Sequence, residues 1–583
     1  MARLALIARL RSCASTLIAN SSLIKLQPHY YEFLDLTVII VYVIGITLYG
    51  LWVARKTRTT EGYFLAGRKL KWWTMMGQAF GTGTHAEMPV AQAGASFSNG
   101  FATIWYQWKN LLITPFYWLI GPWYRRSERT TIAEMINDRY GKGMRLFYTL
   151  FAIAFLVFVM GVMLQGAAKV VAVASGGVIS ANWVVVLMTV AFMVYSVFGG
   201  LVAAAHTEFI QAFLIIVLSF LLIPFGLGEI GGFSAMREAL PEDFFYLYSE
   251  KSGLGGFMIA MLALNGVVGI TAQPHMMAMF ASGNSERAGR VGQTYGTFVK
   301  RLVTIGWVLT GLVVATMVIQ SGITLEDPEH AFGYAAKELL GPGLTGLLVA
   351  CILAANMSSC SNFMVNLGAL FTRDIYQPYI RPDSSETNRL MVGRASGFLL
   401  TIAAVLFALY VENVLSAFLF VETIAAFMGI AIFGGFMWKR ANRYGAFAAV
   451  VLAYVSYYAI NYFETGSFTL IYKWQPGPFG LAMLIGFGTL VIVSLLTQPE
   501  SEEKIKNFFS QMERIAISDQ KENEPVLAEE TGQALILLDV STWFSKKRWA
   551  NFLSRYREDF FGFILAWGFV GVLIGAAWVI LQV

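Results

Sequence analysis

The sequence places two neighbouring hydroxyl side chains inside an apolar run, where they could bind a small cation. Residues 354–362 read Ala-Ala-Asn-Met-Ser-Ser-Cys-Ser-Asn. A dehydrated sodium ion needs about five hard oxygen ligands, and hydroxyls supply them together with carbonyls that are freed where a helix unwinds. Serine in a helix can instead donate to the carbonyl four residues back. Ser358 and Ser359 are therefore candidates for ion binding or for this local hydrogen bond.

Ionisable side chains also occur within apolar segments of the chain. They are Glu87, Lys109 and Glu422, with His85 and His275 as polar companions. Such groups are costly at membrane depth and usually serve a function. Glu87 could contact a cationic or hydroxylated part of a solute, or it could form an ion pair with Lys109.

These residues do not form a catalytic set. The sequence contains no G-x-S-x-G, H-E-x-x-H or phosphate-loop motif. No motif for nucleophilic catalysis or for ATP coupling is therefore present. Cys13, Cys351 and Cys360 are too scattered for a disulfide framework or a zinc site. We expect a protein that is not an enzyme and has no cofactor.

The composition indicates that the surrounding elements lie in a membrane. Of 583 residues, 57% are hydrophobic and 13% are charged, against roughly 25% charged in soluble domains. Spans of about 20 apolar residues cross a bilayer as helices. We predict an all-α polytopic membrane protein of about fourteen transmembrane helices. Its expected parts are an N-terminal extension (1–33), a transmembrane domain (34–497), a cytoplasmic loop with a basic amphipathic helix (498–559) and a last span (560–583).

The orientation follows from the basic residues, which cytoplasmic loops retain. Lys and Arg concentrate in alternate loops, and we place Lys300 and Arg301 in one of them. This pattern predicts a multi-pass protein of the cell membrane with both termini outside. The net charge of +6 then reflects topology and contact with anionic membrane lipid, and does not suggest a nucleic acid partner.

Two of the expected spans are interrupted by glycine and proline. The span that starts at Trp72 contains Gly81, Gly83 and Pro89, and the span that starts at Gly255 contains Pro274. The two spans hold equivalent positions in two five-helix halves of a core at about 72–436. Glycine also serves tight helix packing, but the matched positions favour an inverted repeat with broken helices around a transport site.

Four ordered motifs make the chain similar to the sodium/solute symporter family, which includes sodium/glucose and sodium/proline carriers. The resemblance covers about residues 34–465 and rests on Tyr63-Phe64-Leu65-Ala66-Gly67-Arg68, Thr131-Ile132-Ala133-Glu134 with Arg139-Tyr140, Gly199-Gly200-Leu201 with His206-Thr207-Glu208 and Gln211, and Ala354-Ala355-Asn356-Met357-Ser358-Ser359 with Asp374-Ile375-Tyr376. It implies a LeuT-type 5+5 inverted-repeat fold and sodium-coupled symport of a small organic solute by alternating access. A membrane sensor or a sodium-independent facilitator on the same fold is the alternative.

The resemblance also implies ligands for sodium. In this chain they are the carbonyls of Gly81, Thr84 and Ala355 with the hydroxyls of Ser358 and Ser359. A second sodium ion, which some members bind, would use Glu208, Ser361 and Asn362 together with Ser358. Glu208 stands where the family usually has Asp, and a structural role at a helix N-terminus, stabilised by the helix dipole, is the alternative.

The expected solute-binding positions depart further from the sugar carriers. They are Gly83, Glu87, Met88, Gln107, Asn110 and Gln273. The run Gln273-Pro274-His275 is closer to the proline and organic-acid carriers, yet Gly83 replaces the acidic residue of the proline carriers. The sequence therefore names no particular solute.

Overall fold

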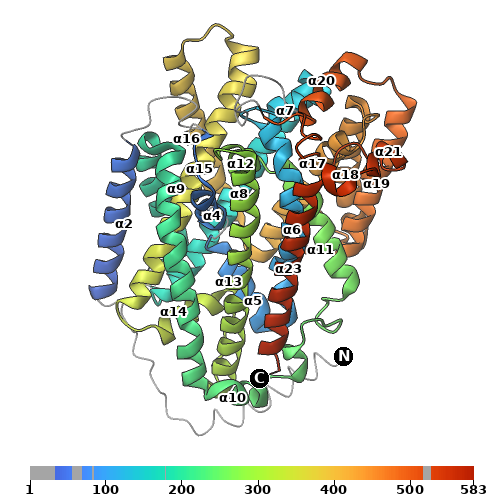
Figure 1. The fold of residues 1–583 in the computed structure, drawn as a ribbon. Coiled ribbons are helices and arrows are strands. Elements are labelled where there is room, and N and C mark those ends of the chain that lie inside the picture. The colour runs from blue at the N-terminus through green and yellow to red at the C-terminus, as the bar shows by residue number, and fades with distance from the viewer. Residues whose placement is uncertain (1–32, 55–67, 82–84, 178, 517–526, 583) are drawn as a thin grey trace.

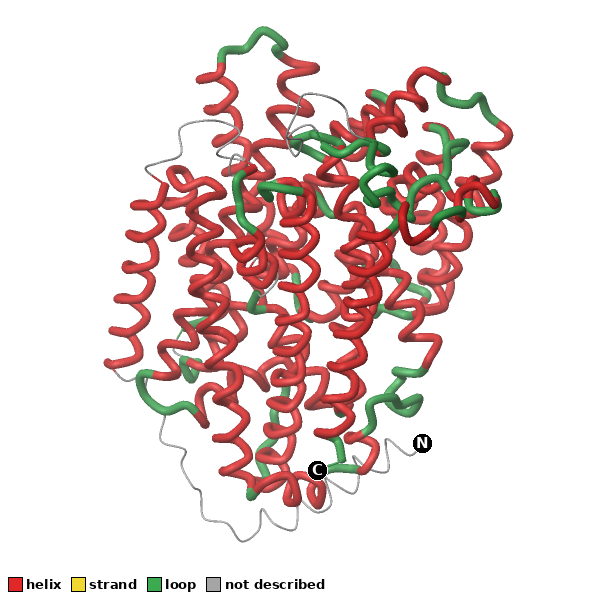
Figure 2. Tube along the Cα trace, viewed as in Figure 1, coloured by secondary structure: helices red, strands yellow, loops and turns green. Residues whose placement is uncertain are grey.

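The computed structural model describes residues 33–54, 68–81, 85–177, 179–516 and 527–582, which are almost entirely helical (Figure 2). The longer helices run side by side along one axis (Figure 1). They are α2 (Phe33–Ala54), α6 (Trp105–Arg126), α8 (Lys142–Ala174), α9 (Ala181–Ile230), α13 (Glu286–Ser321), α15 (Leu344–Leu370), α16 (Glu386–Tyr410), α17 (Val414–Met437), α18 (Arg443–Thr465), α19 (Pro476–Leu496) and α23 (Arg557–Ile580).

Within the described ranges, nine helices are long and apolar enough to cross a membrane, or ten if one bent pair is a single span. This confirms a polytopic all-helical protein but not the predicted count of fourteen. The first core span is divided into α4 (Trp72–Gly81, 10 residues) and α5 (Glu87–Asn99, 13 residues). Each of these is too short to span a bilayer alone, since a span needs about 20 residues.

The apolar runs of the sequence predict two separate spans at 182–197 and 208–227, whereas α9 in the structure is one helix of 50 residues. Residues 198–207, where we expected a loop, include three consecutive alanines (Ala203, Ala204 and Ala205). Alanine has the highest helix propensity, and Gly199 and Gly200 each cost a helix only about 1 kcal/mol, so the helix can continue through this stretch.

Both predicted interruptions are present. The first separates α4 from α5, where Gly83 and Thr84 lie outside the described residues. The second follows α11 (Gly256–Gly269) and the short turn η5 (Ile270–Ala272), beyond which α12 (His275–Ala281) bends away by 74°. Pro274 lies in this bend, where its ring and missing N–H prevent a continuous helix.

Helix α13 packs against the first broken span and against α6. The approach to α4 is so close that a Cβ atom at Gly296 would lie 2.8 Å from the Cα of Met76. On the far side of α5, a Cβ at Gly166 of α8 would lie 2.6 Å from the backbone N of Glu87. Glycine at these two positions lets α13 pack closely on α4, and α8 on the start of α5.

Four buried side chains of alternating charge join α6, α13 and α23. Arg126 donates to Glu286 at 2.7 and 3.0 Å. Arg290 donates to the same carboxylate at 2.8 Å and to Asp559 at 2.6 Å. We call these four residues the charge chain; it holds two cations and two carboxylates, which is the balance that buried ions need.

Polar groups at the ends of α7 (Ile132–Tyr140) and α17 form hydrogen bonds with nearby residues. The end that carries α7, α20 (Glu502–Met512) and α21 (Lys546–Trp549) lies opposite α10 (Gly232–Ala239) in Figure 1. A capping box of Thr131 and Glu134 starts α7. Arg139 near its end donates to four carbonyls where α17 ends, those of Gly435, Trp438, Lys439 and Ala441.

The predicted basic amphipathic helix near 543–556 is not continuous. The segment holds α21 and α22 (Phe552–Arg555), each of four residues, with Asn551 between them in the left-handed region at φ 55°. Arg548 donates to the carbonyls of Leu535 and Ile536 and so faces the protein. A single continuous helix was therefore the wrong interpretation of this pattern of basic and aromatic residues.

Candidate solute and sodium site

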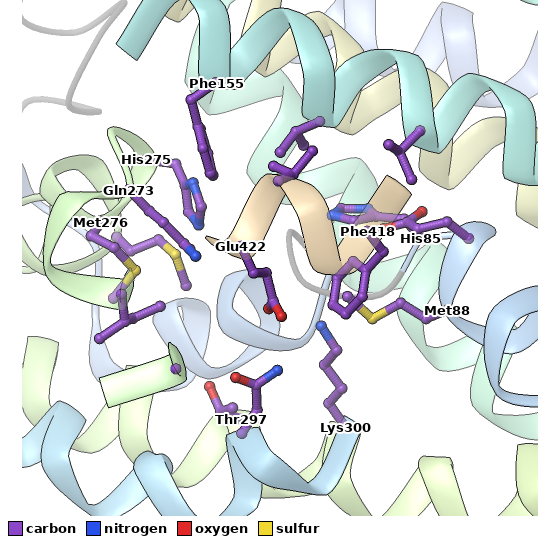
Figure 3. A pocket seen from close by; sticks show the side chains of 18 of the residues that line it. His85, Met88, Phe155, Gln273, His275, Met276, Thr297, Lys300, Phe418 and Glu422 are labelled. Atoms are coloured by element: carbon purple, nitrogen blue, oxygen red, sulfur yellow. The ribbon is translucent and has the colours of Figure 1, made fainter. Parts of the chain in front are cut away.

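A cavity of about 120 Å³ lies between the two broken spans, α6, α8, α13, α15 and α17. Figure 3 shows that side chains from several of these elements converge on it. Its polar lining consists of His85, Glu87, Asn110, Tyr117, Asn265, Gln273, His275, Thr297, Lys300, Arg301 and Glu422. Methionine and phenylalanine side chains supply most of the apolar lining.

The structure brings together most of the solute-binding positions predicted from the sequence. Glu87, Met88, Asn110 and Gln273 all line the cavity. Gln107 is buried on α6 but does not line it, and its amide makes no hydrogen bond to the described residues. Gly83 lies outside those residues.

The ion pair in this region differs from the Glu87–Lys109 pair, which was one of the two alternatives for Glu87. Lys109 pairs with Glu422 of α17 and contacts Asn265 Oδ1 at 3.4 Å. Asn265 in turn donates to Thr423 Oγ1 at 3.1 Å. Glu87 forms no ion pair with any described residue, so the Glu87–Lys109 pair was wrong. The sequence did not reveal which face of α6 carries Lys109.

Two cations of the cavity were assigned to a loop in our sequence interpretation. Lys300 and Arg301 instead lie within α13, and they are 5% and 2% exposed. The preceding residues 286–297 are polar and resemble a loop. The helix begins already at Glu286, where Ser285 caps it by accepting from Ala288 N at 3.1 Å. Recognising Ser285 as an N-cap would have placed both cations at membrane depth.

These two cations have few partners of their own. Among the described residues, Lys300 makes no ion pair or hydrogen bond, and Arg301 Nε and Nη1 have no hydrogen-bond acceptor. The backbone carbonyl of Arg301 accepts from Trp108 Nε1 at 2.9 Å, which fixes α13 against α6. The buried polar lining thus offers unused donors.

The charges around the cavity do not balance. Lys300, Arg301 and Glu87 all line the cavity, while Lys109 and Glu422 neutralise each other. Three cations against two carboxylates leave one formal positive charge. A buried charge without a counterion is strongly disfavoured, so this excess favours a ligand of opposite sign.

The serine pair lies on α15, beside the interruption of the first core span. Asn356 of α15 accepts from Ala86 N at 3.0 Å and donates to the carbonyl of Met163 at 2.6 Å. Side chains three residues apart share a helix face, so Ser359 faces the same way as Asn356. Ser359 is completely buried, and its Oγ has no hydrogen-bond partner among the described residues. Asn356, which we had not assigned, fixes this geometry.

The other expected sodium ligands are described only in part. Ala355 and Ser358 are buried on α15, as are Ser361 and Asn362 of the second site. The side chain of Glu208 is not among the described ones. Its backbone lies in the interior of α9, which begins at Ala181, so a role at a helix N-terminus was wrong.

Broken helices around a buried polar cavity define a secondary transporter. The model of the sodium:solute symporter family matches residues 63–453, and the chain belongs to this family. The fold is also that of a sodium-coupled sialic acid symporter, with a TM-score of 0.67 and 18% identity over 81% of this chain and 100% of that one.

Two curated relatives show how broad the family is. A sodium/glucose cotransporter of Vibrio parahaemolyticus is 26% identical, with 73% of this chain and 84% of that protein covered. The osmoregulated proline transporter OpuE of Bacillus subtilis is 26% identical, with 82% and 97% covered. The chain is accordingly a sodium-coupled symporter of a small solute, as the motifs predicted.

Proposed function

We propose that the transported solute is a small organic molecule with one net negative charge, a monocarboxylate in the simplest case. The observation that carries this proposal is the excess positive charge at Lys300 and Arg301. A solute carboxylate would accept from the unused donors of Arg301 and would balance the charge. Charge-assisted hydrogen bonds of this kind are about twice as strong as neutral ones.

The rest of the lining suits a small and partly apolar body. Asn110 and Gln273 offer amide groups, while Met88, Met276 and Phe418 offer apolar surface. Polar groups that converge beside apolar surface are typical of a site that orients one ligand.

We propose further that sodium binds the carbonyls of Gly81, Thr84 and Ala355 with the hydroxyls of Ser358 and Ser359. The partnerless hydroxyl of Ser359 and the bond from Ala86 N to Asn356 support this assignment. Sodium would stabilise the outward-facing arrangement of the broken helices. Because solute prefers the same arrangement, each ligand raises the affinity of the other.

The remaining architecture is part of the same proposal. The core at about 72–436 would consist of two five-helix halves, and residues 498–559 would lie in the cytoplasm. The matched interruptions support the repeat. The gathering of α7, α20 and α21 at one end, with their basic neighbours, supports a protein of the cell membrane with both termini outside.

Uptake into vesicles tests the solute class. The purified protein would be reconstituted and given labelled lactate, proline, glucose or choline with an inward sodium gradient. We expect sodium-dependent uptake of lactate alone. Equal uptake of glucose, proline or choline would contradict a negatively charged solute.

A variant at the cavity links this result to the structure. Arg301→Gln should weaken the apparent affinity for lactate by about 30-fold, or ~2 kcal/mol, because a charged hydrogen bond is lost. Arg287→Gln on the same helix is the matched control, since its side chain is 77% exposed. Equal affinities for lactate in the two variants would show that Arg301 does not bind the solute.

A further inference from the structure

A second and larger cavity lies away from the solute site. It has a volume of about 540 Å³ and lies between α15, α16 and the π-helix η7 (Phe371–Ile380), next to α7 and α8. In Figure 1 the hairpin of α15 and α16 extends at the end of the molecule that carries α7 and α20. This end also carries most of the basic loops, so it corresponds to the headgroup layer of one leaflet.

Four arginines line this cavity, and they come from three different elements. Arg145 extends from α8, Arg373 from η7, and Arg389 and Arg394 from α16. Arg145 is neutralised by Asp374, to which it donates at 2.9 Å. The lining also includes Glu134, whose carboxylate accepts from Thr130 N at 2.9 Å, and Glu386.

The two arginines of α16 keep donors for a ligand. Arg394 makes no hydrogen bond or ion pair to any described residue. Arg389 uses Nε on Ser384 Oγ at 3.1 Å and Nη2 on the carbonyl of Pro382 at 3.3 Å, which leaves Nη1 available. The arginines exceed the carboxylates even when Asp374 is counted, so the cavity favours an anion.

An apolar stripe on α16 begins at the residue after Leu390, which lines this cavity. Met391, Phe398, Ile402 and Leu409 follow each other at helical spacing and are between 42% and 61% exposed. Side chains at this spacing form one face of a helix. The stripe leads along α16 toward the middle of the membrane, as an acyl chain below a headgroup would.

We propose that this cavity binds the phosphate headgroup of an anionic phospholipid, with one acyl chain along the stripe of α16. Basic pockets between transmembrane helices on the cytoplasmic side bind such headgroups. Arginine suits phosphate because its planar donors match the oxygen atoms. The exposed stripe distinguishes a lipid from a free phosphate, which has no use for an apolar track.

Thermal unfolding of the full chain in detergent tests this site. The protein would be titrated with short-chain phosphatidylglycerol, with phosphatidylcholine of the same chain length, or with inorganic phosphate. We expect phosphatidylglycerol to raise the unfolding temperature in a saturable way, and the other two to have little effect. Equal stabilisation by inorganic phosphate would show a free-anion site and overturn the lipid proposal.

Substitutions at α16 give the second readout. The double variant Arg389→Gln with Arg394→Gln should bind phosphatidylglycerol roughly 25-fold more weakly, since each basic residue near a lipid surface contributes about 5-fold. Arg394→Gln alone should weaken the binding of phosphatidylglycerol about 5-fold. This substitution removes no internal hydrogen bond among the described residues. The control is Arg129→Gln with Arg287→Gln. If the control and the double variant bind phosphatidylglycerol equally well, the lipid binds only nonspecifically around the membrane-facing surface of the protein. The proposed site is then refuted.

Discussion

Ser359 makes the proposed sodium site testable at the scale of one hydroxyl. Since its Oγ has no internal partner, Ser359→Ala removes no hydrogen bond among the described residues. We expect the unfolding temperature to stay nearly unchanged while the apparent sodium affinity falls at least severalfold, because the dehydrated ion loses a ligand. Uptake as a function of sodium concentration measures this.

Ser396→Ala is the matched control for that substitution. Its hydroxyl is also buried but donates to the carbonyl of Val392 at 2.8 Å. We expect an unchanged sodium affinity in this variant. A sodium affinity that is also unchanged in Ser359→Ala would exclude its hydroxyl as a ligand.

The partner of Lys109 can be identified by stability. Glu422→Gln should cost roughly 3–5 kcal/mol of unfolding free energy, because it leaves a buried ammonium without its counterion. Glu87→Gln should cost much less. Adding Lys109→Gln to Glu422→Gln should restore most of the loss. Thermal unfolding of the four proteins measures this, and a larger loss in Glu87→Gln would reassign the pair.

Residue types were easier to predict from the sequence than residue partners. Glu87 and Gln273 could be placed at the cavity because they flank the two interruptions. Lys300 could not, because polar residues before it hid the start of a helix. Asn356 was visible in its motif, but its two hydrogen bonds depend on helices far apart in the sequence.

At the scale of elements, Glu500 ties the start of α18 to the segment before α20. Its carboxylate accepts from Arg443 Nη2 at 2.6 Å and from Arg443 N at 3.0 Å, with Lys504 at 3.3 Å. Burial alone would raise the pKa of Glu500, but the hydrogen bonds from Arg443 and the charge of Lys504 outweigh it. The pKa of Glu500 is therefore lowered from its usual value of 4.5.

A lowered pKa predicts a definite pH dependence of stability. The charged form of Glu500 stabilises the fold above pH 4.5, the usual glutamate value, and this contribution is lost as the pH falls below it. We expect the wild type to exceed Glu500→Gln by no more than about 1 kcal/mol at pH 7, since Arg443 is half exposed. The difference should shrink as the pH falls below 4.5 and the carboxyl becomes protonated. A difference that does not shrink there in thermal unfolding would contradict an ionised Glu500 as its source.

Helix boundaries could be predicted where the backbone chemistry requires them. Pro274 breaks the span that starts at Gly255 because proline lacks an N–H, and the sequence predicted this break. The continuity of α9 was not predicted, although its alanines favour a helix over a loop. The segment 543–556 was misassigned because aromatic and basic residues suit a folded loop as well as a continuous amphipathic helix.

At the scale of the whole molecule, the orientation remains a prediction that labelling can test. Single cysteines at Gly466 and Glu503, on a background without Cys13, Cys351 and Cys360, would be exposed to a membrane-impermeant reagent in intact cells. Gly466 ends α18 and Glu503 lies in α20, on the other side of α19. We expect labelling at 466 only, because the basic end faces the cytoplasm. Labelling of both positions would mean that α19 does not cross the membrane.

The charge chain that joins α6, α13 and α23 has a consequence for the electrical behaviour of transport. Arg126, Glu286, Arg290 and Asp559 sum to zero, so these four side chains together contribute no net charge when their helices move through the membrane field. A displaced charge would couple to the voltage by about 2.3 kcal/mol per 100 mV. Voltage dependence of the cycle must then arise elsewhere, from sodium, from the solute and from the unbalanced cation of the cavity.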